Sequence, residues 1–251
     1  MRMNTKETVV PGFVLKSMVY KENDAIIYVL TRDYGKLSLL ARGVQKIKSK
    51  NAAGCQPLTE SEFRCILRPG ISTLLQAVPT CLYRHIKEDI IQEAYASYFM
   101  ECMYKCVADN EPNAYIYDFF MRSMQELEAG KSPELLYCLF NAFILKITGS
   151  SPQVDGCIHC GNVHAISGVS IADGGFVCQN CQASYDKSFS KSILQAFRYI
   201  NKGDFSILDK IHITPDELLE IVTIMESLVD EYTGIRLHSR QFIKQLERME
   251  E

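Results

Sequence analysis

The sequence predicts an α+β protein of more than one domain: a small N-terminal β-barrel, then an α-helical domain with an inserted four-cysteine module. Three observations predict this fold. Short apolar segments separated by turn residues fill the first 80 positions, apolar residues recur about every four positions from residue 81 onward, and two Cys-x-x-Cys pairs follow. The 251 residues, 47% hydrophobic and 23% charged, have the composition of a folded protein and the length of two or three domains.

Five short strands are expected in residues 1–80. Segments 13–20, 25–31, 36–41, 62–67 and 72–78 are rich in Val, Ile, Leu and aromatic residues and are bounded by turn signals. Five strands in about 80 residues suit a small closed or partly open barrel, of which the OB-fold is one kind. Residues 42–57 lack a strand pattern and are predicted to form an exposed, mobile basic loop.

The second predicted domain, residues 81–251, has the helical period. One long amphipathic helix is expected over 81–107, and Asn110-Glu111-Pro112 ends it. A second helix follows, and a third begins with Ser132 as N-cap and Pro133 at its first position. A short helix is expected around 193–200, and the capping box from Thr214 to Glu217 predicts the start of another.

The four-cysteine insert, at about 154–184, carries the most specific chemistry. Cys157 and Cys160 form one Cys-x-x-Cys pair, Cys178 and Cys181 form the other, and seventeen residues separate them. This spacing is typical of sites in which four thiolates bind one zinc ion in a tetrahedron. Because four thiolates leave no open coordination position, the predicted Zn²⁺ is structural. Four buried thiols or a redox pair are the alternative, and the other six cysteines are interpreted as small buried hydrophobes.

Charge is distributed unevenly along the chain. Residues 1–80 hold twelve Lys and Arg against six Asp and Glu, a net charge of +6, whereas the remainder has a net charge of −9. A basic domain indicates phosphate contact, although a run of cations is often only a solvated surface. The predicted phosphate contacts are Arg32, Lys36, Arg42, Lys46, Lys48 and Lys50. Tyr20, Tyr28, Tyr34 and Phe63 are either base-stacking groups or core residues, and alternation does not separate the two.

Other classes of protein are disfavoured. No apolar run approaches the roughly 20 residues of a membrane-spanning helix, and no secretory signal precedes the barrel. Ten cysteines without an export signal indicate a reducing compartment, so a cytoplasmic location is expected. The motifs of metalloproteases, P-loop and dinucleotide enzymes and nucleophile elbows are missing, so the sequence predicts neither an enzyme nor a small-molecule substrate.

The order of basic barrel, helical domain and four-cysteine insert resembles the bacterial RecO family of DNA repair proteins, over nearly the whole chain. The residues that carry the likeness are Gly12-Phe13-Val14-Leu15, the element from Leu30 to Ser38, Ala41-Arg42-Gly43, the basic run ending at Lys50, residues 143–149 with the cysteines after them, and the segment from Leu237 to Phe242. Gln45 and Ile47 depart from the family pattern, which often has a basic residue or proline there.

The resemblance implies a non-enzymatic recombination mediator. Proteins of this family bind single- and double-stranded DNA, anneal complementary strands and, with RecR, help to load RecA onto DNA coated by the single-stranded DNA-binding protein SSB. Such a protein would be cytoplasmic and nucleoid-associated when acting. Two other classes share the basic barrel: an RNA-binding zinc-ribbon module, which would prefer structured RNA, and a non-catalytic protein scaffold, which would bind no nucleic acid.

Overall fold

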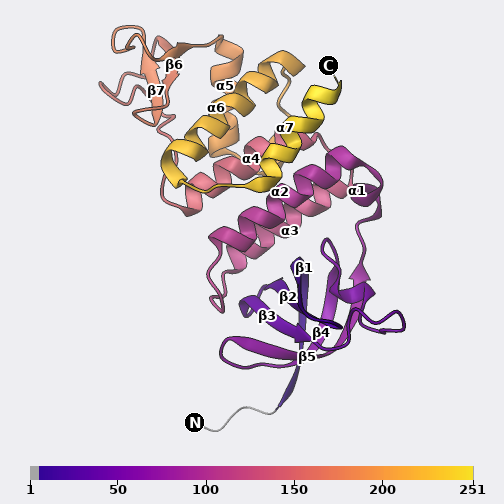
Figure 1. Ribbon diagram of the computed structural model, residues 1–251. Helices are drawn as coiled ribbons and strands as arrows, with labels where there is room; N and C mark the ends of the chain where they lie inside the picture. Colours follow the sequence, from indigo (N-terminus) through magenta and orange to yellow (C-terminus); the bar gives the residue numbers. More distant parts are fainter. Residues whose placement is uncertain (1–5, 251) are drawn as a thin grey trace. The chain divides into compact units, whose positions relative to one another are not determined.

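The computed structural model describes residues 6–250, with side chains through residue 246. It divides into two compact units: unit 1 contains the chain up to Ala129 together with the segment from Leu237 onward, and unit 2 is Gly130–Arg236. A closed five-stranded barrel, helices and a small three-stranded sheet with a cysteine cluster confirm the predicted fold class (Figure 1). The change from strand to helix falls where the sequence predicts it, because the last barrel strand ends at Cys81 and the first helix begins at Arg84.

The barrel strands are β1 (Glu7–Lys21), β2 (Asp24–Thr31), β3 (Gly35–Ala41), β4 (Glu60–Ile66) and β5 (Ile71–Cys81), in the order β1-β2-β3-β5-β4. Strand β1 is longer than predicted because its two halves have different partners. Its first half pairs with β4 from Glu7 to Phe13, and the part from Phe13 onward pairs with β2. Inward-facing apolar side chains, among them Val14, Ile27 and Phe63, close the core.

The helices of unit 1 are α1 (Arg84–Glu88), α2 (Ile90–Cys106), α3 (Ala114–Glu128) and α7 (His238–Glu250). The prediction of one long helix over 81–107 is wrong, because the chain breaks at Asp89. This residue has an extended backbone, and its carboxylate accepts hydrogen bonds from the backbone N–H groups of Ile91 and Gln92. An N-cap of this kind starts a new helix even though the apolar period continues through the break.

Helix α7 returns to unit 1 and packs along α2 (Figure 1). The Glu101 carboxylate of α2 accepts hydrogen bonds from the backbone N–H groups of His238 and Ser239, which are the first of α7. Burial opposes the charged form of Glu101, but these bonds and those from Lys105 and the Ser239 hydroxyl lower its pKa to about 2. The carboxylate therefore supplies the cap that this helix does not find in its own sequence.

Unit 2 contains α4 (Pro133–Ile147), α5 (Lys191–Lys202) and α6 (Pro215–Thr233), and the sheet of β6 (Ile166–Ser170), β7 (Gly175–Cys178) and β8 (Lys187–Ser188). Two short 3-10 turns, η1 (Ala53–Cys55) in unit 1 and η2 (Phe205–Ile207) in unit 2, complete the elements. The predicted Ser132 cap and the capping box of Thr214 and Glu217 are confirmed. None of the helices within the described part of the chain is long and apolar enough to cross a membrane.

Candidate metal centre and nucleic-acid interface

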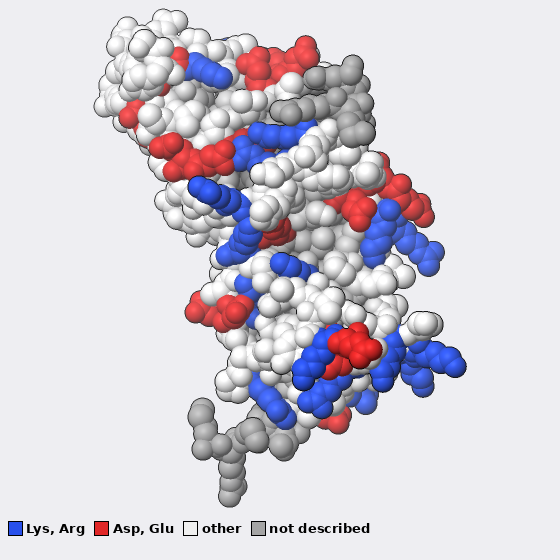
Figure 2. Space-filling view, viewed as in Figure 1, with Lys and Arg blue, Asp and Glu red and all other residues white. Residues whose placement is uncertain are grey.

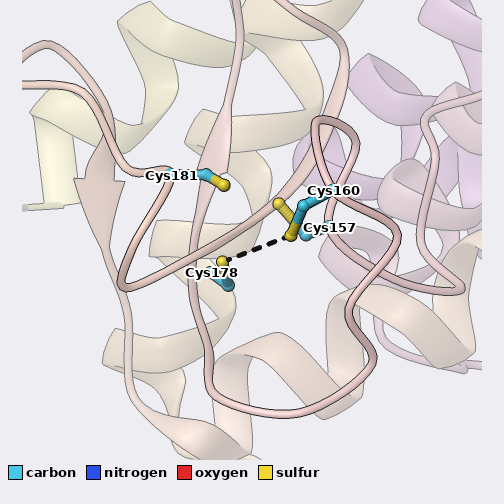
Figure 3. A group of neighbouring side chains, drawn as sticks. All are labelled: Cys157, Cys160, Cys178 and Cys181. Atoms are coloured by element: carbon cyan, nitrogen blue, oxygen red, sulfur yellow. Dashed lines mark hydrogen bonds between the residues drawn. The ribbon is translucent and has the colours of Figure 1, made fainter.

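The four cysteines predicted as metal ligands lie together in unit 2. The sulfur atoms of Cys157, Cys160, Cys178 and Cys181 all lie within 4.8 Å of one another, and Figure 3 shows the side chains directed at a common space. The Cys160 and Cys178 sulfurs are 3.8 Å apart. Thiolates that bind one ion at about 2.3 Å in a tetrahedron are separated by about 3.8 Å. The cluster can therefore hold one metal ion.

Tight turns position both cysteine pairs. The Gly161 N–H donates to the Cys157 carbonyl oxygen at 2.8 Å, and the Cys181 N–H donates to the Cys178 carbonyl oxygen at 3.0 Å. Gly161 has a φ of 71° and Gly174, at the tip between β6 and β7, has a φ of 75°. Glycine adopts this left-handed region without a steric cost, so the hairpin can return Cys178 to the first pair.

The pKa values of two thiols of the cluster shift in opposite directions. Burial opposes the Cys157 thiolate, but backbone N–H groups of Cys160, Cys178 and His159 lower its pKa to about 6. At Cys181 the reverse holds, because hydrogen bonds with the Cys160 and Cys178 side chains raise its pKa to about 12. Thiolates are the form that binds metal, and four of them at this distance repel one another unless a cation lies between them.

The nearby histidines stand outside the ligand set. His159 Nε2 lies 3.3 Å from the Asp173 carboxylate rather than among the sulfurs. Within the described residues, the group that can hold an ion consists of the four cysteines and does not include His164. A histidine is therefore not needed to complete the tetrahedron.

The four-cysteine module is tied to α5 by charge and by ring packing. Asp155 forms ion pairs with Arg198, at 3.1 Å, and with Lys202. The hydrogen bonds from Lys202 and Arg198 hold the pKa of the Asp155 carboxyl below its usual range. Phe176 of β7 packs against Phe197 of α5 with ring centroids 5.8 Å apart. Arg198 and Lys202 thus share one carboxylate partner within unit 2.

The remaining six cysteines lie away from this cluster. Cys55, Cys65, Cys102 and Cys138 are buried, whereas Cys81 and Cys106 are half-buried. Burial raises the pKa of Cys55 to about 12 and that of Cys106 to about 11. The raised pKa values keep the Cys55 and Cys106 thiols protonated at neutral pH. The predicted role as small buried hydrophobes fits the four buried cysteines, whereas Cys81 and Cys106 are only half-buried.

The predicted basic loop, residues 42–57, is a run of turns anchored to the barrel at both ends. Val44 and Cys55 are buried in the barrel core. Between them, the Asn51 side chain donates to the Leu75 carbonyl oxygen at 3.3 Å and accepts from the Ala77 N–H at 3.1 Å. The prediction of an exposed loop is confirmed for residues 45–48, which have exposed side chains; its mobility stays a prediction.

Four of the predicted phosphate contacts project from this loop. Arg42, Lys46, Lys48 and Lys50 are exposed, and residues 42–59 contain no acidic side chain. Among the residues that the structure describes, none of the four forms an ion pair. Figure 2 shows Lys and Arg side chains gathered over the barrel, with a few acidic groups among them. These charges therefore remain available to an anionic partner.

An open cleft of about 450 Å³ lies beside the loop, and Lys21, which is not among the predicted phosphate contacts, lines it. Lys21, Arg42 and Lys46 line it, together with Glu22, Asn23, Asp24 and Gly43. Two hydrogen bonds hold its walls: the Gly43 N–H donates to Asp24 Oδ1 at 2.7 Å, and the Gln45 N–H donates to the Asn23 carbonyl oxygen at 3.1 Å. Because β2 pairs antiparallel with both β1 and β3, the β1–β2 turn lies beside the end of β3, and this neighbourhood follows from the strand pairing.

The structure places Lys36 and Arg32 apart from this group. Only 9% of the Lys36 side chain is exposed, and its ammonium donates to the Tyr104 carbonyl oxygen at 2.5 Å and lies 3.2 Å from Asp109. Arg32 forms two hydrogen bonds with Asp118 of α3, at 2.9 and 3.0 Å. Both side chains thus already have partners that connect the barrel to the helices of unit 1.

The four aromatic candidates separate into two kinds. Phe63 is fully buried in the barrel core, and Tyr28 packs edge-on against Tyr104 with ring centroids 4.9 Å apart. Tyr20 and Tyr34 are exposed. Tyr20 directly precedes Lys21, whose ammonium lies 5.5 Å from the Tyr20 ring centroid. One exposed ring therefore lies next to the cleft.

Fold and site together define a class of protein: a basic β-barrel followed by a helical region with a four-cysteine metal site. Residues 3–83 match the family described as "Recombination protein O N terminal" and residues 87–241 match "Recombination protein O C terminal". The chain is 32% identical over 240 residues to the DNA repair protein RecO of Bacillus pumilus, which covers 95% of this chain and 94% of the relative. It is 28% identical, with the same coverage, to the DNA repair protein RecO of Bacillus subtilis. The chain belongs to the RecO family of recombination and DNA repair proteins.

Proposed function

We propose that this protein is a recombination mediator that binds single- and double-stranded DNA through its barrel and anneals complementary strands. The observation that carries the proposal is the group of exposed cations without carboxylate partners on the anchored loop, Arg42, Lys46, Lys48 and Lys50. Lys21 adds a fifth cation across the cleft. A row of such charges on a fixed backbone is suited to a flexible polyanion.

Annealing follows from the same charges without a chemical step. Two complementary strands repel each other through their phosphates, and cations that displace condensed counterions lower this repulsion. Base pairing then supplies the free energy, so nucleotide hydrolysis is not needed. Because the binding is electrostatic, affinity and annealing rate both fall steeply as the salt concentration rises.

The ion at the four-cysteine site is zinc in this proposal. Four thiolates in a tetrahedral arrangement are a typical structural zinc site, and the tight turns place the sulfurs at the required spacing. Zinc would neutralise much of the charge of the thiolates and join the two turns through all four sulfurs. With every coordination position taken by sulfur, the ion has a structural role and no open position for catalysis. Membership of the RecO family supports a mediator that is not an enzyme.

Membership of the RecO family supports the proposed partners. We expect the protein to act with RecR, to contact SSB and to help RecA load onto strands that SSB coats. Its place of action would be the cytoplasm, on nucleoid DNA. These partners are proposed from the family and not from a named surface of this chain.

The test is annealing of two complementary labelled oligonucleotides, one of them coated with SSB, without nucleotide. We expect the protein to accelerate annealing at low salt and to lose this effect as salt rises. The triple variant Lys46→Glu, Lys48→Glu, Lys50→Glu should not bind or anneal. A matched control, Lys187→Glu, Lys191→Glu, Lys210→Glu, changes the charge equally at exposed positions of unit 2 and should keep both activities.

Three results would contradict the proposal. Unchanged DNA affinity of the loop variant at low salt would remove the loop from the binding site. Tighter binding to structured RNA than to single-stranded DNA would instead support an RNA-binding protein. Absence of binding to any nucleic acid by the folded, metal-loaded protein would support a protein scaffold.

A further inference from the structure

Ile47 is an apolar side chain at a fully exposed position of the basic loop. Its relative exposure is 104%, the highest among the exposed large hydrophobic side chains of the described chain. Single exposed apolar residues are common on protein surfaces. This one, however, lies at the centre of the cation group, with Lys46 before it, Lys48 after it, and both lysines exposed.

The backbone around Ile47 is held by successive turns. The Lys46 N–H donates to the Gly43 carbonyl oxygen at 3.2 Å, and the Ser49 N–H donates to the Lys46 carbonyl oxygen at 2.8 Å. Val44 and Cys55 fix the two ends of the loop in the barrel core, so the tip projects between anchored ends. Isoleucine is also stiff about its first side-chain torsion. An apolar group of defined orientation is thus presented between two cations.

We propose that Ile47 is the base-contacting residue of the loop, which packs against the faces of unstacked bases while the lysines beside it hold phosphates. The inference rests on the proposed DNA binding and deepens it. Lysine–phosphate contacts hold only the backbone of a strand, whereas the base faces of a single strand are apolar and incompletely stacked. An isoleucine is a suitable group for this contact, because aliphatic side chains insert between base steps in several DNA-binding proteins.

The contact would set a strand preference. In a duplex the base faces are covered by stacking, so Ile47 can reach them only by paying the unstacking free energy. In a single strand they are accessible. Ile47 should therefore contribute to the affinity for single-stranded DNA more than to the affinity for duplex DNA, and its contribution should not depend on salt.

The first experiment compares Ile47→Ser with the unsubstituted protein on three oligonucleotides: a single strand, its duplex, and a single strand whose residues are abasic. We expect about fivefold weaker binding to the single strand, little change on the duplex, no change on the abasic strand, and an unaltered salt slope. Because Ile47 is fully exposed, its truncation removes no core contact. Val9→Ser is the control. Val9 is an exposed β-branched residue near the start of β1, at the opposite end of this strand from Lys21, and the variant should bind like the unsubstituted protein.

A second experiment uses the fact that the chain contains no tryptophan. Ile47→Trp places a single indole at the loop tip, and its fluorescence should be quenched by single-stranded DNA and not by the abasic strand. Leu219→Trp, at an exposed position of α6, is the control and should show no quenching.

The outcomes separate this inference from the proposed function. If the unsubstituted protein binds single-stranded DNA but Ile47→Ser binds equally well, the inference is overturned and the proposed function stands. An equal loss on normal and abasic strands also overturns it, because Ile47 would then act through the shape of the loop. Failure of the unsubstituted protein to bind any DNA at low salt overturns both.

Discussion

The basic loop of the barrel and the four-cysteine module of unit 2 differ in whether the cations beside them form ion pairs. Both are irregular segments with cations nearby. In the loop, Lys46 and Lys48 project without an ion pair among the described residues, whereas at the module Arg198 and Lys202 both bind Asp155. The number of positive charges is therefore a weaker guide to function than the presence or absence of a partner for each charge.

The two segments also owe their shape to different interactions. Burial of Val44 and Cys55 and the hydrogen bonds of Asn51 hold the loop. The module is held by a small sheet and by ring packing and ion pairs to α5, and its four sulfurs lie close enough together to bind one ion. Variants that disrupt one segment should therefore leave the other intact, which gives three ways to test the comparison.

The largest effect is expected from Cys178→Ser combined with Cys181→Ser. Loss of two ligands should abolish metal binding and unfold residues 154–184, because ligation contributes on the order of 10 kcal/mol to the folding of such sites. Metal analysis and limited proteolysis measure both changes. Cys81→Ser, outside the cluster, should keep the metal. Affinity for single-stranded DNA should change less than about twofold, and a parallel loss of affinity would show that the segments are not independent.

A smaller effect is expected from two separate variants of the barrel, each of which neutralises one lysine. Lys36→Met should lower the free energy of unfolding by about 2 kcal/mol, because it leaves the Tyr104 carbonyl and Asp109 without their donor, and should not alter the salt slope. Lys48→Met should leave stability unchanged and lower the salt slope for single-stranded DNA by about 0.7. Denaturant titration and fluorescence anisotropy over a salt series distinguish the two. If Lys36→Met instead left stability unchanged and lowered the salt slope, Lys36 would be a phosphate contact.

The smallest effect concerns the anchor of the loop. Asn51→Ala removes the two hydrogen bonds to β5 and should lower the free energy of unfolding by about 1 kcal/mol. Because no charge changes, affinity for single-stranded DNA should fall about twofold with the same salt slope. Asn162→Ala, which removes a turn hydrogen bond to His164 in the module, is the matched control and should bind DNA normally. A changed slope in Asn51→Ala would mean that the loop's cations need the anchor to reach phosphates.

Local features of the chain were predictable from sequence because they depend on neighbouring residues. The cap at Ser132, the capping box at Thr214 and the turn at Gly161 each follow from side chains or backbone within a few positions. The four-cysteine cluster was predictable as well, because each Cys-x-x-Cys pair is set by one turn. The break at Asp89 was missed although its signal is local, since an aspartate inside an apolar period is usually a surface residue.

Which basic and aromatic residues are available to a partner was decided only by the tertiary structure. Lys36 and Lys46 look alike in the sequence, but strand pairing places the first against α2 and its following loop and leaves the second in solvent. Lys21 joins the cleft through a turn more than twenty residues from Lys46. Phe63 is buried in the barrel core, whereas Tyr20 is exposed. Sequence patterns report the period of an element, whereas exposure depends on which other elements pack against it. The sequence by itself therefore determined the strands, the caps and the four cysteines of the cluster, and tertiary packing decided which charges remain without partners.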